Sequence, residues 1–146
     1  MDPVTGGPKV NELMETSIPG VFACGNVVHV HDIVDFVTKE ARRAGAGAAR
    51  LIKGAVENGN TVQTRPGKGV RYIVPQVIRP ANMDQKQTLF FRVTDVFKDK
   101  ELALYGDDKL LRRIKKRHMA PGEMVMVEVT REELASCGTL RIEVEG

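Results

Sequence analysis

The pattern of apolar and polar residues divides the chain near residues 59–68. Before this stretch the pattern predicts a strand, a loop and one helix, and after it the pattern predicts strands only. The stretch itself lies within NGNTVQTRPGKG, whose Gly, Pro, Asn and Thr residues are typical of a linker. We therefore predict a first part at residues 1–58, a linker at 59–68 and a second part at 69–146.

The first part combines a short apolar run with an amphipathic pattern. Gly20–Cys24 (GVFAC) is apolar and lies between Pro-Gly and Gly-Asn, which predicts a strand covered on both faces, as in a parallel sheet. Small or apolar residues then recur every three or four positions, which predicts one face of a helix. This face consists of Val34, Val37, Ala41, Ala44, Ala48, Leu51 and Ala55.

The expected helix has three further features. Asp32 or Asp35 could cap its N-terminus, and Glu40 is expected on its polar side. Gly45 and Gly47 each cost about 1 kcal/mol relative to alanine in a helix. Such glycines indicate either ordinary tight packing on a sheet or the close approach of a neighbouring backbone or a flat ligand.

The second part is rich in β-branched and large apolar residues that alternate with polar ones. Gly106-Asp107-Asp108 and Ala120-Pro121-Gly122 are typical of hairpin turns, and Thr130–Glu133 (TREE) predicts a capped helical turn before the last strand. About six short strands favour an antiparallel immunoglobulin-like β-sandwich, and so an α+β chain overall. The expected strands are Arg71–Ile78, Gln87–Val93, Glu101–Tyr105, Lys109–Lys115, Met124–Val129 and Thr139–Glu145.

Composition narrows the class of protein. With 42% apolar and 28% charged residues, the chain is not of the disordered or collagen-like kind. No apolar run approaches the ~20 residues that cross a bilayer, and no leader pattern opens the chain, so we expect a cytoplasmic protein without a membrane partner. Cys24 and Cys137 form no CxxC pair, and we expect Cys24, in its apolar run, to be a buried reduced thiol.

Charge gives little reason to expect a nucleic-acid partner. The net charge is only +3, and the one dense basic run is Leu111–His118 (LRRIKKRH). This run has no interleaved aromatic residues and leads directly into a turn. We interpret it as a solvated strand face whose charges discourage edge-to-edge pairing, with a phosphate-binding stripe as the alternative.

One motif points to a family. Thr16–Asn26 (TSIPGVFACGN) resembles the end of the FAD domain in pyridine nucleotide-disulfide oxidoreductases of the thioredoxin reductase kind. There the phrase reads Thr, a few residues, Pro-Gly-(Val/Ile)-(Phe/Tyr)-Ala-x-Gly-Asp, followed by a loop and a helix rich in Ala and Gly. This chain matches at every position but the last, where Asn26 replaces the aspartate. The resemblance covers about the first 55 residues and implies that residues 1–58 are the C-terminal segment of an FAD-binding domain.

The resemblance also implies a cofactor and its contacts. FAD is the expected cofactor and NAD(P)H the expected co-substrate. Gly25 would let the backbone approach the ribityl chain, and Asn26 would hydrogen-bond one of its hydroxyls. Phe36, Val37 and Thr38 cover the helix start that would point at the flavin ring. No catalytic residue is assigned.

Several parts of such an enzyme are absent from this sequence. It contains no GxGxxG fingerprint for FAD and none for a nicotinamide nucleotide. We expect a C-terminal fragment of a flavin-dependent NAD(P)-linked oxidoreductase, completed by N-terminal FAD and NAD domains and inactive alone. Homo-oligomer formation stays open. The alternative is that the β-sandwich is a docking module that recruits a partner subunit.

Two histidines lie in the loop before the helix. His29 and His31 alternate and so face the same side of an extended segment, an arrangement that can bind a metal. No third ligand is apparent from spacing, and we assign no metal. A histidine beside the flavin or its substrate, and structural hydrogen bonding, are the other two interpretations.

Overall fold

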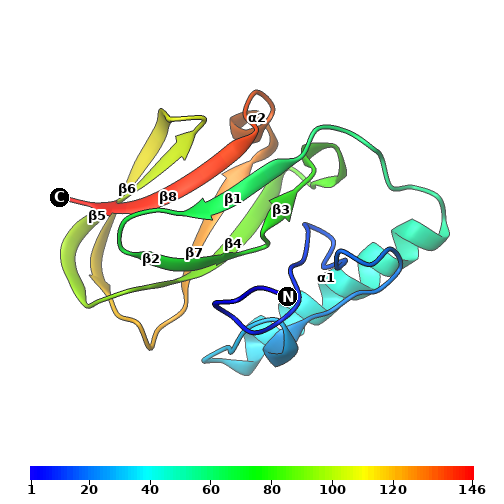
Figure 1. The fold of residues 1–146 in the computed structure, drawn as a ribbon, viewed down its shortest axis with the longest axis horizontal. Coiled ribbons are helices and arrows are strands. Elements are labelled where there is room, and N and C mark those ends of the chain that lie inside the picture. The colour runs from blue at the N-terminus through cyan, green and yellow to red at the C-terminus, as the bar shows by residue number, and fades with distance from the viewer.

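The computed structural model describes residues 1–146 as a mixed α+β fold in which strands predominate (Figure 1). Two sheets, rich in antiparallel pairs, are accompanied by one long helix and three single helical turns. The strands are β1 (Val62–Pro66), β2 (Val70–Val74), β3 (Val77–Ile78), β4 (Lys86–Val93), β5 (Phe97–Gly106), β6 (Lys109–Met119), β7 (Val125–Thr130) and β8 (Thr139–Glu145). The helices are η1 (Gly25–Val27), α1 (Val34–Ile52), η2 (Pro80–Asn82) and α2 (Arg131–Leu134).

The two sheets enclose one main core. The five-stranded sheet has the order β3-β1-β8-β5-β6 and the three-stranded sheet the order β2-β4-β7. A cluster of 19 buried residues draws side chains from both sheets, and Leu140, Ile142 and Val144 supply every second residue of β8 to it. This alternation was expected from the sequence LRIEVE. The capped turn was also expected: Thr130 Oγ1 accepts from Glu133 N–H, and the Glu133 carboxylate accepts from Thr130 N–H.

The strand arrangement differs from the immunoglobulin-like prediction in two ways. β1 and β8 pair in parallel, so the sheets are not purely antiparallel. In an immunoglobulin sandwich the last two strands are neighbours, whereas here β8 lies between β1 and β5 while β7 belongs to the other sheet. The chain changes sheets between Met119 and Val125, so β7 pairs with β4 rather than β6.

The predicted linker at 59–68 contains a strand. β1 occupies Val62–Pro66, where it pairs with β3 and β8 and buries the side chains of Val62 and Thr64. The turn-forming composition of this stretch concealed the strand because its two buried residues are separated and flanked by Gly, Asn and Pro.

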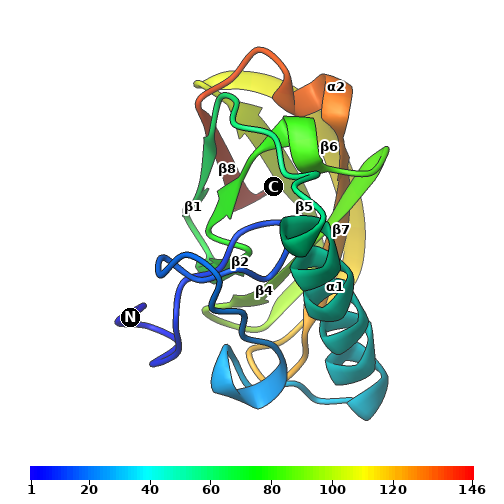
Figure 2. The same ribbon diagram turned by 90° about the vertical axis from the view of Figure 1, so that its right-hand side faces the viewer.

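The predicted strand at Gly20–Cys24 is wrong. Only Phe22 forms a β-bridge, to Glu15, and no ladder develops on either side. An apolar extended segment becomes a strand only where a neighbouring strand continues its hydrogen bonds. Here the pairing with Met14–Thr16 stops after two backbone hydrogen bonds, Thr16 N–H to Val21 O and Ala23 N–H to Met14 O. Instead, the N-terminal loops lie beside α1 (Figure 2), and a second, smaller core packs them on β2. This core contains Val10, Met14, Val28, Ala44, Tyr72 and Val74.

Helix α1 forms as expected but buries a different stripe. Its buried residues are Glu40, Ala44 and Gly47, whereas Val34 on the predicted apolar face is 75% exposed. The N-cap is Ile33, which has no side-chain acceptor, rather than Asp32 or Asp35. Neither α-helix has the length and apolar character needed to cross a membrane.

Candidate functional site

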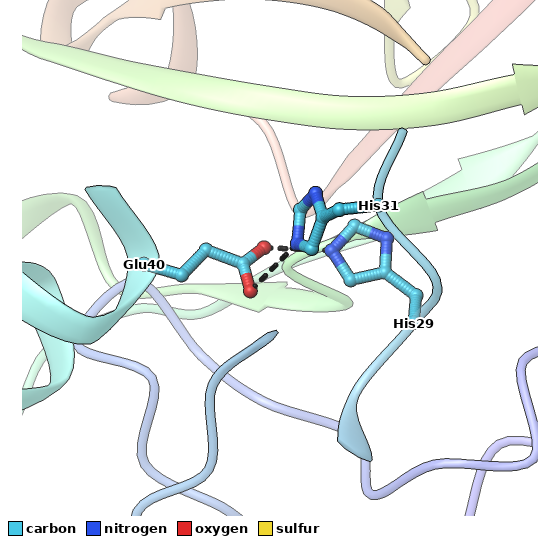
Figure 3. A group of neighbouring side chains, drawn as sticks. All are labelled: His29, His31 and Glu40. Carbon is cyan, nitrogen blue, oxygen red and sulfur yellow. Dashed lines mark hydrogen bonds and ion pairs between the residues drawn. The ribbon is translucent and has the colours of Figure 1, made fainter. Parts of the chain in front are cut away.

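Three titratable side chains meet beneath α1, and Figure 3 shows them pointing toward one another. Glu40 comes from the second turn of the helix, and His29 and His31 come from the loop that follows η1. His29 Nε2 lies 2.6 Å from Glu40 Oε1, and His31 Nε2 lies 3.0 Å from Glu40 Oε2. All three side chains are 1% exposed. We call His29, His31 and Glu40 the His–Glu–His cluster.

Neighbouring groups orient the cluster. Gly25 N–H donates to Glu40 Oε2 at 2.8 Å, and Tyr72 Oη lies 3.3 Å from His29 Nδ1. Gly25 has φ +72°, a backbone conformation that residues with a Cβ rarely adopt. A Cβ added at this position would lie 3.1 Å from Val37 Cγ1. This glycine therefore lets the loop bring its N–H to the carboxylate.

Aromatic side chains enclose the cluster. Phe90 of β4 lies 5.7 Å from His31 and 6.0 Å from His29, measured between ring centroids. Phe36 of α1 lies 6.2 Å from His31 and 5.7 Å from Phe90. These rings surround the imidazoles with apolar surface, which lowers the local dielectric constant.

Glu40 remains ionised in this environment. Burial by itself would raise the pKa of its carboxyl group, but interactions with His29, then with His31 and the Gly25 N–H, outweigh burial. The pKa of Glu40 therefore lies below its ordinary value. In contrast, burial raises the pKa of Tyr72, so its phenol stays protonated and available to His29.

A second set of contacts holds the histidine loop to the sheets. Arg92 of β4 donates to Val30 O at 2.9 Å and pairs with Asp32. The Asp32 carboxylate also accepts from Met124 N–H at 2.5 Å. Asp32 thus joins the loop to β4 and to the connection between β6 and β7, instead of capping α1.

A cavity of about 280 Å³ lies between α1 and the outer face of the three-stranded sheet, and Glu40 borders it. Phe90 and Met126 supply its apolar wall, and Lys39 and Arg43 supply positive charge from α1. Burial lowers the pKa of Arg43 from its ordinary value, although an arginine remains protonated at neutral pH. The cavity gives small ions or molecules a route toward the cluster.

The structure separates the site residues predicted from the sequence into two groups. Gly25, Phe36 and Val37 lie against the His–Glu–His cluster or its supports. Asn26 and Thr38 are exposed: Asn26 Oδ1 accepts from His31 N–H at 3.2 Å, and Thr38 Oγ1 donates to Val34 O at 3.2 Å.

Sequence reasoning missed Glu40. The residue lies three positions after Val37 and four before Ala44, so an acid interrupts the inward face of the helix. An acid at such a position, preceded by two alternating histidines, was the available signal. Comparisons with models of known protein families, with curated proteins and with solved structures find no match for this chain.

Proposed function

We propose that this chain is the C-terminal segment of an FAD-dependent, NAD(P)-linked oxidoreductase that acts in the cytoplasm. Residues 1–58 would contribute the segment beneath the ribityl chain and the helix start that faces the isoalloxazine ring. The two-sheet part would be an appendage to the flavin domain. The FAD and NAD domains would come from residues outside this sequence, because it contains neither nucleotide fingerprint.

The observation that carries this proposal is the geometry at the end of the TSIPGVFACGN motif. Gly25 adopts a left-handed conformation close to the first turns of α1, and Asn26 next to it is exposed. The N-cap residue Ile33 leaves the helix start without a side-chain cap. Free N–H groups and the positive end of the helix dipole would favour the anionic, reduced flavin.

The distribution of exposed apolar side chains along the chain supports further domains that contact residues 1–58. All the exposed large apolar side chains except Val96, Leu110 and Met126 lie within the first 52 residues. Val34 and Ile52 in this region are 75% and 87% exposed. Only three of the 19 residues of α1 are buried. Exposed apolar residues concentrated in this part of the chain are expected where further domains cover residues 1–58.

Because few exposed large apolar side chains lie in the two-sheet part, their distribution weighs against the alternative that this part is the main docking module. The basic run of that part lies on β6, the edge strand of the five-stranded sheet. Its side chains are exposed or half-buried, in agreement with the interpretation as a solvated strand face.

The test uses both this chain and the full coding frame that contains it. We expect no FAD binding by the 146-residue chain in fluorescence titration, and stoichiometric FAD and NAD(P)H-dependent flavin reduction in the complete protein. Asn26→Leu should weaken FAD retention in the complete protein, because it removes a polar group at the expected ribityl contact. Asn58→Leu, at another exposed asparagine, should not.

Two results would overturn the proposal. One is a submicromolar dissociation constant for FAD with this chain alone, since residues 1–58 would then be a self-sufficient site. The other is a complete protein that purifies without flavin and does not bind added FAD.

A further inference from the structure

His31 has an unusual environment for a buried side chain. Its side chain is 1% exposed, and neither Nδ1 nor Nε2 has a hydrogen-bond partner. Nε2 approaches Glu40 Oε2 to 3.0 Å but lies outside hydrogen-bonding geometry. Buried polar groups normally form hydrogen bonds, so an imidazole that lies 3.0 Å from a carboxylate without forming one calls for a physical explanation.

The His–Glu–His cluster has the donor set of a metal centre. One ligand atom from each of the three residues lies within 4.8 Å of the other two. Divalent zinc binds imidazole nitrogen and carboxylate oxygen at about 2.0–2.2 Å, so neighbouring ligands around one ion stand roughly 3.3 Å apart. The 2.6 Å and 3.0 Å pairs in the cluster would widen by less than 1 Å to admit an ion.

His29 and Glu40 have the contacts that orient metal ligands. Histidine ligands typically hydrogen-bond through the nitrogen that does not bind the metal, and here His29 Nδ1 contacts Tyr72 Oη while Nε2 faces the cluster centre. Gly25 N–H holds Glu40 Oε2. Each carboxylate oxygen has two lone-pair directions, so this bond leaves a direction free for an ion.

We propose that His29, His31 and Glu40 bind a divalent transition-metal ion of the zinc or ferrous-iron kind. Nitrogen ligands select such ions over magnesium and calcium, which prefer oxygen. Two imidazoles and one carboxylate leave at least one coordination position for water or another ligand. Glu40 borders the 280 Å³ cavity beside α1, which provides the way in. The site uses only residues of this chain and does not depend on flavin binding.

The direct test is Zn²⁺ titration of the EDTA-treated 146-residue chain by calorimetry, with bound metal counted by mass spectrometry. We expect one equivalent of Zn²⁺. Substitution with Co²⁺ should produce visible absorption bands of a low-symmetry, four- or five-coordinate site. This readout needs no variant and reports on ligand geometry directly.

Variants assign the ligands. Glu40→Gln and His31→Gln should each weaken Zn²⁺ binding by more than about 100-fold, because removal of an outer-shell partner alone costs about 10–100-fold. Tyr72→Phe, which removes such a partner, should cost about 10-fold. Glu128→Gln and His118→Gln are the matched controls: both residues are exposed, and Glu128 lines the same cavity.

The His31→Gln variant distinguishes loss of a metal ligand from loss of folding. His31→Gln removes the 3.0 Å contact with Glu40 but no bond within hydrogen-bonding geometry, and glutamine is polar, so this variant should keep the circular dichroism of the wild type even if Glu40→Gln does not fold. Absence of Zn²⁺ and Co²⁺ binding by the wild type would overturn the proposal. So would a folded His31→Gln variant that binds Zn²⁺ as tightly as the two controls, because the ion would then be held elsewhere.

Discussion

Substitution of Gly47 by alanine tests the contact that positions α1. A Cβ at this position would lie 2.5 Å from Leu13 O, 2.9 Å from Leu13 Cβ and 3.2 Å from Phe22 Cε1. Carbon atoms pack best at about 3.5–4.0 Å, and the backbone carbonyl cannot rotate away. The helix or the loop would therefore have to move by about 1 Å, and overpacking of this kind costs about 1–3 kcal/mol.

Gly45→Ala is the matched control. Gly45 lies on the same helix, and a Cβ added there would have no heavy atom within 4 Å from outside its own helix backbone. Both alanines gain about 1 kcal/mol of helix propensity. That gain cancels in the comparison, so Gly47→Ala should be less stable than Gly45→Ala by about 1–3 kcal/mol.

The measurement is thermal unfolding followed by circular dichroism, combined with hydrogen exchange of the α1 amides. Each kcal/mol corresponds to roughly 2–4 °C in a chain of this size. Hydrogen exchange shows whether the loss is confined to α1 and the smaller core, as expected for a locally unfolding unit. If Gly47→Ala equals or exceeds Gly45→Ala in stability, α1 does not approach the Leu13 backbone as closely as we describe.

Three further changes have defined outcomes. Cys24 is half-buried and Cys137 is 7% exposed, and burial raises the pKa of the Cys137 thiol. Iodoacetamide should therefore label Cys24 first and Cys137 only slowly, and the labelling of Cys137 should become faster as the pH rises. Equal labelling rates for the two cysteines in the folded protein would contradict this. Thr130→Ala should cost about 1 kcal/mol of unfolding free energy in urea denaturation, since it removes the cap of α2; a change below a few tenths would mean that the cap adds nothing. Arg92→Lys removes the guanidinium whose Nη2 donates to both Val30 O and Asp32. It should speed hydrogen exchange in the histidine loop by about 10-fold, as loss of about 1.4 kcal/mol implies; unchanged exchange would show that Asp32 is held without it.

The local features of this protein were readable from its sequence. The turn at Thr130–Glu133 follows from a capping box, and β8 follows from alternating apolar residues whose bounds match the prediction. α1 follows from its three- and four-residue spacing, although it ends at Ile52, one turn before the last residue of the predicted face. Each depends on residues that are neighbours along the chain, and so the local pattern contains the information needed to predict it.

Other features depended on residues far apart in the sequence. Gly20–Cys24 has the composition of a buried strand but lacks a strand to pair with, while Val62–Pro66 looks like a linker and becomes a strand through its parallel pairing with β8. Glu40 looks like a surface acid on a helix. It can be buried only because the fold brings His29, His31 and the Gly25 N–H to its carboxylate.

The physical reason is the same in these three cases. A backbone edge or a charged side chain leaves water only if a partner replaces the lost hydrogen bonds, and that partner comes from another part of the chain. The sequence by itself determined the helix α1, the alternating strand β8 and the capped turn before it. The tertiary structure decided which of them pair, and it assembled the His–Glu–His cluster from a loop and a helix whose separate patterns did not reveal it.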